Sequence, residues 1–269
     1  MKKSLFIALL FAISVELISC FKVPVTGRRQ LNLLPESMLL NMSLTNYRDF
    51  LSKSPGKTAS DADVQTVRKV GNSLVASINQ FLKQKKQTKR VKNFKWEFNV
   101  VDDKTINAWC MPGGKVVVYT GILPVTANEK GLAVVMGHEI AHAIARHGNE
   151  RMSQQMGVAL GGMTLAVALS QKPTEVQNLF MTSFGIGSTL GILKYSRTHE
   201  SEADKMGLIF MAMAGYDPSE GVVFWERMKA ATGGANVPQL LSTHPSDDTR
   251  IKDLKAFLPT AMKYYKKPA

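Results

Sequence analysis

A helix that carries two histidines one turn apart is the feature that most constrains this chain. Residues 126–148 have apolar side chains at helical spacing and include the motif His138-Glu139-Ile140-Ala141-His142. Positions four apart lie on one face of a helix, so both imidazoles can reach a single ion, and Glu139 projects beside them. The pattern predicts one continuous helix with a metal site on its face.

Flanking residues predict where this helix begins and ends. Thr126 and Glu129 match a capping box, and Arg146, His147 and Gly148 provide a basic last turn and a C-cap. His147 is therefore expected to be a cation at the helix C-terminus rather than a ligand.

The two histidines need a further ligand. Zinc held by three protein groups keeps a fourth position for water, lowers the pKa of that water toward about 7 and polarises a carbonyl group. Downstream, Glu200 and Asp204 lie one turn apart near the start of another predicted helix. We expect Glu200 to bind the metal and Asp204 to accept the free N–H of a liganding histidine. Glu139 would then take the proton of the attacking water.

The rest of the pattern predicts an α+β fold that is mostly helical. Three short segments have the alternation or β-branched composition of strands, and Pro112-Gly113-Gly114 predicts a hairpin turn between the last two. Residues 156–193 are apolar and glycine-rich, with a break near Lys172-Pro173, and fit two packed helices or a hairpin that dips into a membrane. Further helices are expected at 61–82, 199–214, 218–231 and 247–258, and strands at 94–100, 105–111 and 116–120.

The N-terminal residues predict export. Lys2 and Lys3 precede an apolar stretch at 5–15 that is too short to span a bilayer but suits a signal peptide. The ending Leu17-Ile18-Ser19-Cys20 resembles a bacterial lipobox, and this resemblance implies that Cys20 is acylated. An ordinary secretory signal or an uncleaved anchor is the alternative. We therefore divide the chain into a signal peptide (1–19), a lipidated cysteine with a tether (20–59) and a catalytic domain (60–269).

Charge and cysteine content exclude little by themselves. The net charge of +13 fits exposed lysines, or contact with acidic lipid headgroups. No nucleic-acid motif accompanies it, so we expect no nucleic-acid partner. If Cys20 is acylated, Cys110 has no intramolecular disulfide partner and is expected to be buried.

Several separated motifs resemble one peptidase family. From about residue 60 onward the chain is similar to the HtpX-like and CAAX prenyl protease type 1 family of gluzincin zinc peptidases, and to its bacterial lipoprotein branch in particular. The matching segments are Asn107-Ala108 with Pro112-Gly113-Gly114, the histidine motif at 138–142, Arg197 with Glu200 to Asp204, Thr243-His244-Pro245 with Arg250-Ile251, and the tether sequence at 24–31.

The resemblance implies roles for further residues. It implies that Glu200 is the third ligand of one zinc ion, and that Asn107 and Ala108 lie on the exposed edge strand of a small antiparallel sheet beside the cleft. An extended substrate would add to that edge through backbone hydrogen bonds. His244 would approach the active site, either to stabilise the oxyanion or in a structural role, and Arg250 would orient its loop.

These features together predict a zinc-dependent endopeptidase that removes misfolded or misassembled proteins of the bacterial cell envelope. Its partners would be unfolded or extended proteins and the membrane that holds lipidated Cys20, facing the periplasm. Phe21 in place of an aspartate after the cysteine favours the outer membrane. The alternative is a zinc-containing assembly factor or chaperone for outer-membrane proteins that rarely cleaves them. Oligomeric state is not predicted.

Overall fold

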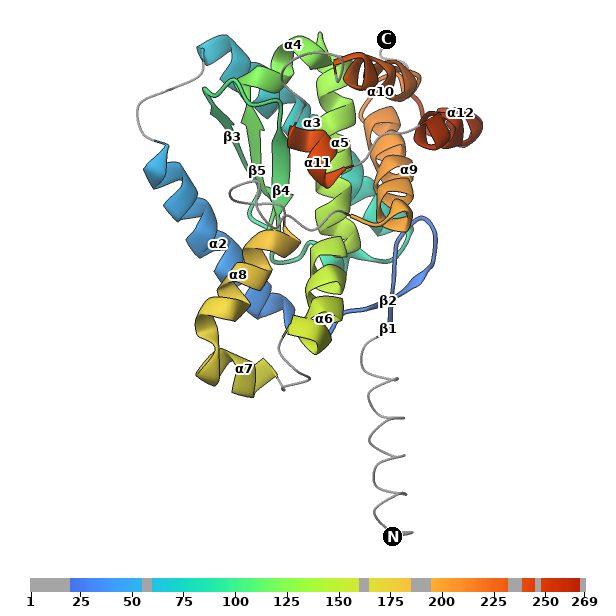
Figure 1. The fold of residues 1–269 in the computed structure, drawn as a ribbon. Coiled ribbons are helices and arrows are strands. Elements are labelled where there is room, and N and C mark those ends of the chain that lie inside the picture. The colour runs from blue at the N-terminus through green and yellow to red at the C-terminus, as the bar shows by residue number, and fades with distance from the viewer. Residues whose placement is uncertain are drawn as a thin grey trace.

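The computed structural model describes residues 20–54, 60–159, 165–184, 195–231, 239–244 and 248–266, so the expected signal peptide lies outside the described chain. Helices surround a small sheet, which confirms the mostly helical α+β class (Figure 1). The strands are β1 (Cys20–Lys22), β2 (Arg29–Leu31), β3 (Glu97–Val101), β4 (Ala108–Met111) and β5 (Lys115–Tyr119). The α-helices are α2 (Glu36–Lys53), α3 (Asp61–Gln84), α4 (Leu123–Thr126), α5 (Glu129–Ala145), α6 (His147–Ala159), α7 (Leu165–Gln171), α8 (Pro173–Ser183), α9 (Arg197–Met213), α10 (Glu220–Ala230), α11 (Gln239–Thr243) and α12 (Asp248–Met262).

The central sheet is mixed rather than antiparallel. Its strand order is β3-β5-β4, with β4 antiparallel and β3 parallel to β5. The predicted β4–β5 hairpin is confirmed, and its turn uses Gly113 and Gly114 at φ values of 85° and 79°, which favour glycine. The chain reverses after β3 and again after β4, so β3 and β5 run in the same direction. In the sheet, β5 lies between the other two strands. β4 is thereby an edge strand, as expected.

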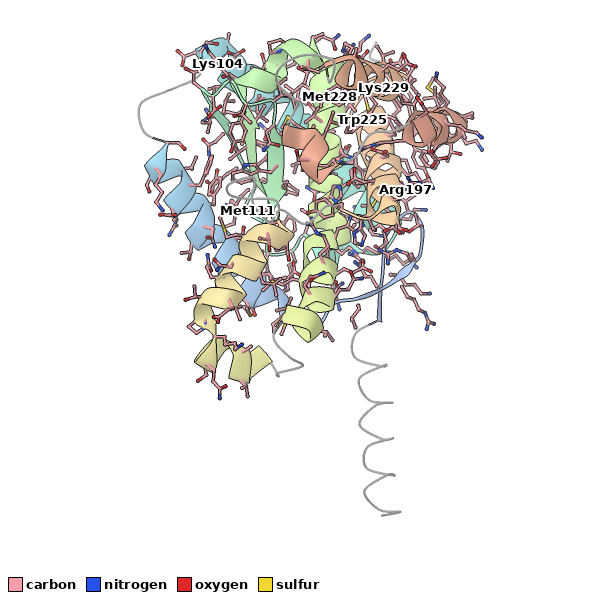
Figure 2. The ribbon with its side chains drawn as sticks, in the orientation of Figure 1. Lys104, Met111, Arg197, Trp225, Met228 and Lys229 are labelled. Carbon is pink, nitrogen blue, oxygen red and sulfur yellow. The ribbon has the colours of Figure 1, made fainter. Side chains whose placement is uncertain are left out.

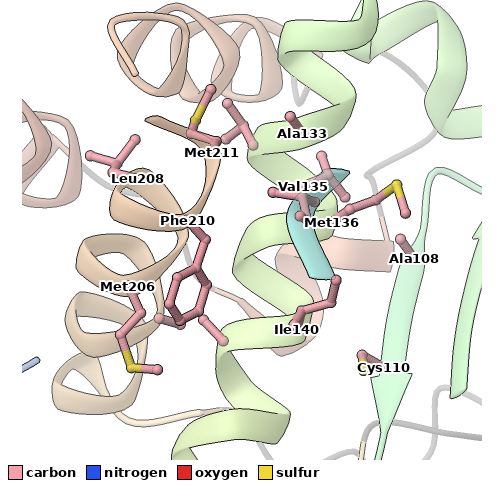
Figure 3. Packing of buried hydrophobic residues seen from close by; sticks show 14 of the residues in the cluster. Ala108, Cys110, Ala133, Val135, Met136, Ile140, Met206, Leu208, Phe210 and Met211 are labelled. Carbon is pink, nitrogen blue, oxygen red and sulfur yellow. The ribbon is translucent and has the colours of Figure 1, made fainter. Parts of the chain in front are cut away.

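Helices α5 and α9 pack together along their length and form the centre of the larger hydrophobic core (Figure 3). Two glycines allow the backbones to approach closely just before the first motif histidine. A Cβ atom added to Gly207 would lie 3.0 Å from the backbone nitrogen of His138, and one added to Gly137 would lie 3.2 Å from the carbonyl oxygen of Gly207. This close approach places the acidic residues at the start of α9 beside the histidines of α5.

The predicted boundaries of the motif helix need correction at both ends. The side chain of Asn128, not Thr126, caps α5 by accepting hydrogen bonds from the backbone nitrogens of Lys130 and Gly131. At the other end Arg146 adopts the left-handed conformation, at φ 61°, and α6 begins at His147. The chain therefore turns immediately after α5 instead of ending a helix at Gly148.

The described part of the expected tether is folded onto the domain. β1 and β2 form an antiparallel hairpin, and Leu39 and Tyr47 on α2 are each 1% exposed. Tyr47 packs edge-on against Trp109 of β4, with ring centroids 6.3 Å apart, and Glu36 pairs with Arg146 at 3.1 Å. Because one face of α2 is covered by the rest of the protein, the folded unit begins before residue 60.

The glycine-rich region is helical where it is described. α6, α7 and α8 fall within or next to it, and α8 begins at Pro173, which confirms the predicted break. Residues 160–164 and 185–194 lie outside the described chain. None of the described helices combines the length and apolar character needed to cross a membrane. The short helix α11 was not predicted.

Candidate active site

The motif histidines face one another inside the protein. His138 and His142 are 2% and 3% exposed, and their Nε2 atoms lie 3.1 Å apart. They project from the same face of α5, as the four-residue spacing predicts. Two imidazole nitrogens thus point at a common position.

The first turn of α9 brings Glu200 to the same position. The Ser196 side chain caps this helix by accepting a hydrogen bond from the backbone nitrogen of His199. One carboxylate oxygen of Glu200 lies 3.5 Å from Nε2 of His138, and the other lies 3.4 Å from Nε2 of His142. The structure therefore brings together the three residues expected to be ligands.

His244, which follows α11 directly, supplies a fourth donor. Its Nδ1 lies 2.9 Å from Oε1 of Glu200 and 3.2 Å from Nε2 of His138. The four residues His138, His142, Glu200 and His244, called the ligand group below, are all buried, and one ligand atom of each lies within 4.8 Å of the others. A zinc ion bound by all four would have no tetrahedral position left for water. In a tetrahedral site, an open position for water would require His244 to withdraw.

Asp204 and Arg250 form a layer behind the ligand group. Nδ1 of His138 donates to Oδ1 of Asp204 at 2.9 Å, as predicted, and this bond leaves Nε2 of His138 directed at the metal position. Arg250 donates to both oxygens of Asp204 at 2.7 and 2.8 Å and pairs with Glu200 at 2.8 Å. The guanidinium carbon of Arg250 lies 3.4 Å from the centroid of the Trp225 ring on α10. Trp225 is labelled in Figure 2. Arg250 thus holds two carboxylates of the site, a role beyond the expected orientation of a loop.

Glu139 lies at the edge of the ligand group. It is 4% exposed, its Oε1 lies 3.5 Å from Nε2 of His244, and that oxygen has no hydrogen-bond partner among the described residues. Burial raises the pKa of Glu139, partly offset by His244 and His138. A buried carboxylate with a raised pKa is suited to exchange protons with a bound reactant.

The residues present fit a divalent zinc ion. Imidazole nitrogen and carboxylate oxygen are the donor types of catalytic zinc sites. Burial lowers the pKa of His138, but its hydrogen bonds to Asp204 and Glu200 outweigh burial and raise that pKa to about 9, so the position attracts positive charge. The free oxygen of Glu139 beside the ligand group also calls for a water or a cation nearby. The chemistry of this donor set therefore matches the expected cofactor.

The expected substrate edge is covered in this structure. Asn107 and Ala108 are 6% and 2% exposed, although β4 is an edge strand beside α5. The backbone nitrogen of Leu240 in α11 donates to the carbonyl oxygen of Ile106 at 3.2 Å, which places α11 against the start of β4. The same segment delivers His244 to the ligand group. Substrate addition at Asn107 and Ala108 remains a prediction and requires α11 to move.

The predicted environment of His147 is wrong. This histidine was expected as a cation at a helix C-terminus, but its side chain is fully buried between His142 and Glu202 at the start of α6. Burial lowers the pKa of His147 to about 4, although Glu202 raises it. The error followed from the helix boundary, because α5 ends before His147. Cys110 is buried, as expected, and burial raises the pKa of its thiol.

This geometry agrees with the comparison to known families. The model of peptidase family M48 matches residues 70–258, which include the ligand group and Glu139. The chain belongs to peptidase family M48. The expected enzyme class, a zinc metallopeptidase, is confirmed at the level of this family.

Relatives come from mitochondria and from bacteria. The mitochondrial metalloendopeptidase OMA1 of Schizosaccharomyces pombe is 32% identical over 89% of this chain and 66% of its own length. Human OMA1 is 29% identical over 89% of this chain and 46% of its own length. A beta-barrel assembly-enhancing protease of Yersinia pestis is 27% identical over 71% of this chain and 38% of its own length. The M48 chain thus spans two thirds or less of the length of these relatives.

Proposed function

We propose that this M48 chain is a zinc-dependent endopeptidase that cleaves unfolded or extended segments of misfolded or misassembled cell-envelope proteins. The observation that carries the proposal is Glu139, whose buried and unpartnered carboxylate oxygen lies beside the ligand group. A protein that only stores zinc or binds a partner has no need of a proton acceptor at this position.

The chain's own residues divide the chemistry among them. When bound, zinc supplies a Lewis acid that polarises the scissile carbonyl and lowers the pKa of water toward about 7. His138, His142 and Glu200 would hold it. Glu139 takes a proton from the attacking water at a carboxylate oxygen and delivers that proton to the leaving amine. Asp204 fixes the tautomer of His138, so that Nε2 keeps its lone pair for the metal.

A cavity beside the ligand group is consistent with a peptide as the substrate. Its volume is about 270 Å³, and it lies between α9 and α12. Glu200 and Arg250 form part of its wall, and Leu254 and Phe257 provide apolar surface. Because Glu200 lines this cavity, a peptide bound at the ligand group would have apolar surface next to it for one of its side chains.

A role in assembly is the alternative function. The bacterial relative's name joins beta-barrel assembly with proteolysis, and the cleft could bind extended chains without cutting them. We favour cleavage because binding alone does not explain a buried carboxylate beside the ligand group with an oxygen that has no hydrogen-bond partner among the described residues.

We further propose that the protein belongs to the bacterial lipoprotein branch of the family and is anchored through acylated Cys20, facing the periplasm, in the outer membrane. The signal-like N-terminal sequence supports the anchor, and the named bacterial relative supports an envelope setting. Mass spectrometry of the mature N-terminus tests the anchor: wild type should carry lipid at Cys20, and Cys20→Ser should not.

The Glu139→Gln variant tests the proposed activity. We expect it to bind zinc as wild type does and to hydrolyse unfolded casein about 10²–10⁴-fold more slowly, the range contributed by a general base. Glu175→Gln is the matched control, because Glu175 is exposed on α8 away from the ligand group.

The outcomes separate the two functions. Zinc-loaded Glu139→Gln protein that still cleaves casein at the wild-type rate would refute the role of Glu139. Full envelope function in cells that carry only Glu139→Gln would favour the assembly role.

A further inference from the structure

The outer nitrogen of His142 begins a buried chain of hydrogen bonds. Nδ1 of His142 lies 3.0 Å from Nδ1 of His147, and Nε2 of His147 lies 3.0 Å from Oε2 of Glu202 on α9. Because Nε2 of His142 faces the ligand group, its Nδ1 carries the proton and donates to His147. A neutral imidazole accepts at one nitrogen and donates at the other, so His147 donates from Nε2 to Glu202.

The hairpin that follows Cys20 holds the carboxylate at the end of this chain. Arg28 lies between β1 and β2, and it donates from Nη2 and Nε to the two oxygens of Glu202 at 2.9 and 3.0 Å. The hydroxyl of Thr26 donates to Glu202 at 2.6 Å. The turn is closed by two backbone hydrogen bonds, and Gly27 adopts the required left-handed φ of 69°. Figure 1 shows the hairpin beside the N-terminal end of α9.

Arg28 also pairs with a second buried carboxylate. Its Nη1 and Nη2 donate to the two oxygens of Glu150 on α6, each at 2.7 Å. His199 and Gln30 contact the same carboxylate at 3.0 and 3.2 Å. Burial raises the pKa of both Glu150 and Glu202. Hydrogen bonds from Arg28 and His199 outweigh burial at Glu150, and those from His147 and Arg28 outweigh it at Glu202. Both pKa values are therefore lowered to about 2. One guanidinium thus compensates two buried negative charges.

The two motif histidines are therefore supported in the same manner. His138 donates directly to Asp204, which Arg250 holds. His142 donates through His147 to Glu202, which Arg28 holds. Partners of this kind orient a liganding imidazole and fix its tautomer, and removing one costs about 10–100-fold in metal affinity or activity.

We propose that Arg28 is a positioning residue for the metal ligand His142, acting through Glu202 and His147, so that the N-terminal hairpin is part of the active site. The inference rests on the proposed metallopeptidase function, because it takes His142 as a zinc ligand. Without Arg28, Glu202 and Glu150 would be buried together without a cation. Turning Glu202 toward water relieves that repulsion and removes the acceptor of His147.

The test compares Arg28→Ala and Arg28→Lys with Arg29→Ala in the full chain. Arg29 is the matched control because it is the neighbouring residue of the hairpin but is exposed. Zinc affinity is measured by chelator competition, well below each variant's melting temperature. Visible absorption of the cobalt-substituted protein reports the arrangement of the ligands.

We expect Arg28→Ala to bind zinc about 10–100-fold more weakly and to change the cobalt spectrum. Arg28→Lys should recover part of the affinity, since one ammonium group cannot pair with both carboxylates as the guanidinium does. Glu202→Gln should behave like Arg28→Ala, and it replaces Arg28→Ala in the test if that variant does not fold. Arg29→Ala should match wild type.

One result would overturn the proposal: Arg28→Ala and Glu202→Gln melt at lower temperatures but keep wild-type zinc affinity and an unchanged cobalt spectrum. The hairpin would then only stabilise the fold. Failure of the proposed peptidase function would be a different result, namely a wild-type protein that binds zinc but cleaves no peptide. The zinc and cobalt measurements would still decide the role of Arg28 in that case.

Discussion

Replacing Asp204 by asparagine tests the support of the first motif histidine. Oδ1 of Asp204 accepts from His138 at 2.9 Å and from Nη2 of Arg250 at 2.7 Å, and Oδ2 accepts from Nε of Arg250 at 2.8 Å. An asparagine amide in the same place has one acceptor and one donor. The amide can be placed in two ways. In one, its NH2 group faces Nε of Arg250; in the other, it faces both His138 and Nη2 of Arg250. In either case at least one buried donor faces another donor instead of an acceptor.

The size of the effect follows from these contacts. A buried donor left without its acceptor costs about 1–3 kcal/mol, and the loss of a charged acceptor weakens the His138 bond as well. At about 1.4 kcal/mol for each tenfold change, Asp204→Asn should weaken zinc binding by about 10–100-fold.

Zinc affinity measured by chelator competition provides the assay for Asp204→Asn. Asp61→Asn is the control, because Asp61 is exposed in the first turn of α3. Wild-type zinc affinity in a folded Asp204→Asn protein would refute the claim that Asp204 orients His138.

Three further predictions concern other parts of the site. His244→Ala should weaken zinc binding but increase casein hydrolysis, because it opens a position for water; slower hydrolysis at saturating zinc would instead indicate that His244 acts on the substrate. Gly207→Ala should lower the free energy of unfolding by about 1–3 kcal/mol, since its Cβ would lie 3.0 Å from the backbone of α5; unchanged stability in denaturant titrations would contradict the close packing. The stability that Arg28 provides through Glu150 and Glu202 is present above their ordinary pKa of 4.5 and is lost as pH falls toward about 2. The difference in free energy of unfolding between wild type and Arg28→Ala should therefore shrink over that pH range, and a constant difference would refute the ion pairs as its source.

Local periodicity predicted the elements that supply the ligands. The spacing of His138 and His142 requires a helix if both are to face one ion, and α5 has that geometry. Glu200 and Asp204 share the first turns of α9 for the same reason. The long helix α3 was also predicted, because its apolar residues recur at helical spacing over many turns.

The predictions of helix ends and of strand pairing are wrong or incomplete where they depend on distant parts of the chain. The sequence rule favours glycine for the residue that ends a helix, so Gly148 was preferred, whereas Arg146 takes the left-handed conformation and pairs with Glu36 of α2. The sequence also does not determine which strand pairs with β3. Alternating apolar and polar residues show that a segment is a strand but not which strand it pairs with. The segment before residue 60 has turn residues typical of a linker, and only its contacts with the rest of the protein show that it is folded.

Asp204 could be predicted from its position one turn after Glu200, but the arginine contacts that support the two motif histidines could not. Arg28 and Glu202 are 174 residues apart, and Arg250 and His138 are 112 apart, so no local pattern links them. Each support ends in an arginine because a buried carboxylate needs a cation, and a guanidinium can bind two carboxylates at once. Arg250 comes from α12 and Arg28 from the first hairpin, whereas the motif histidines and Glu200 lie on α5 and α9. The metal site is therefore complete only when both ends of the described chain have folded onto that helix pair.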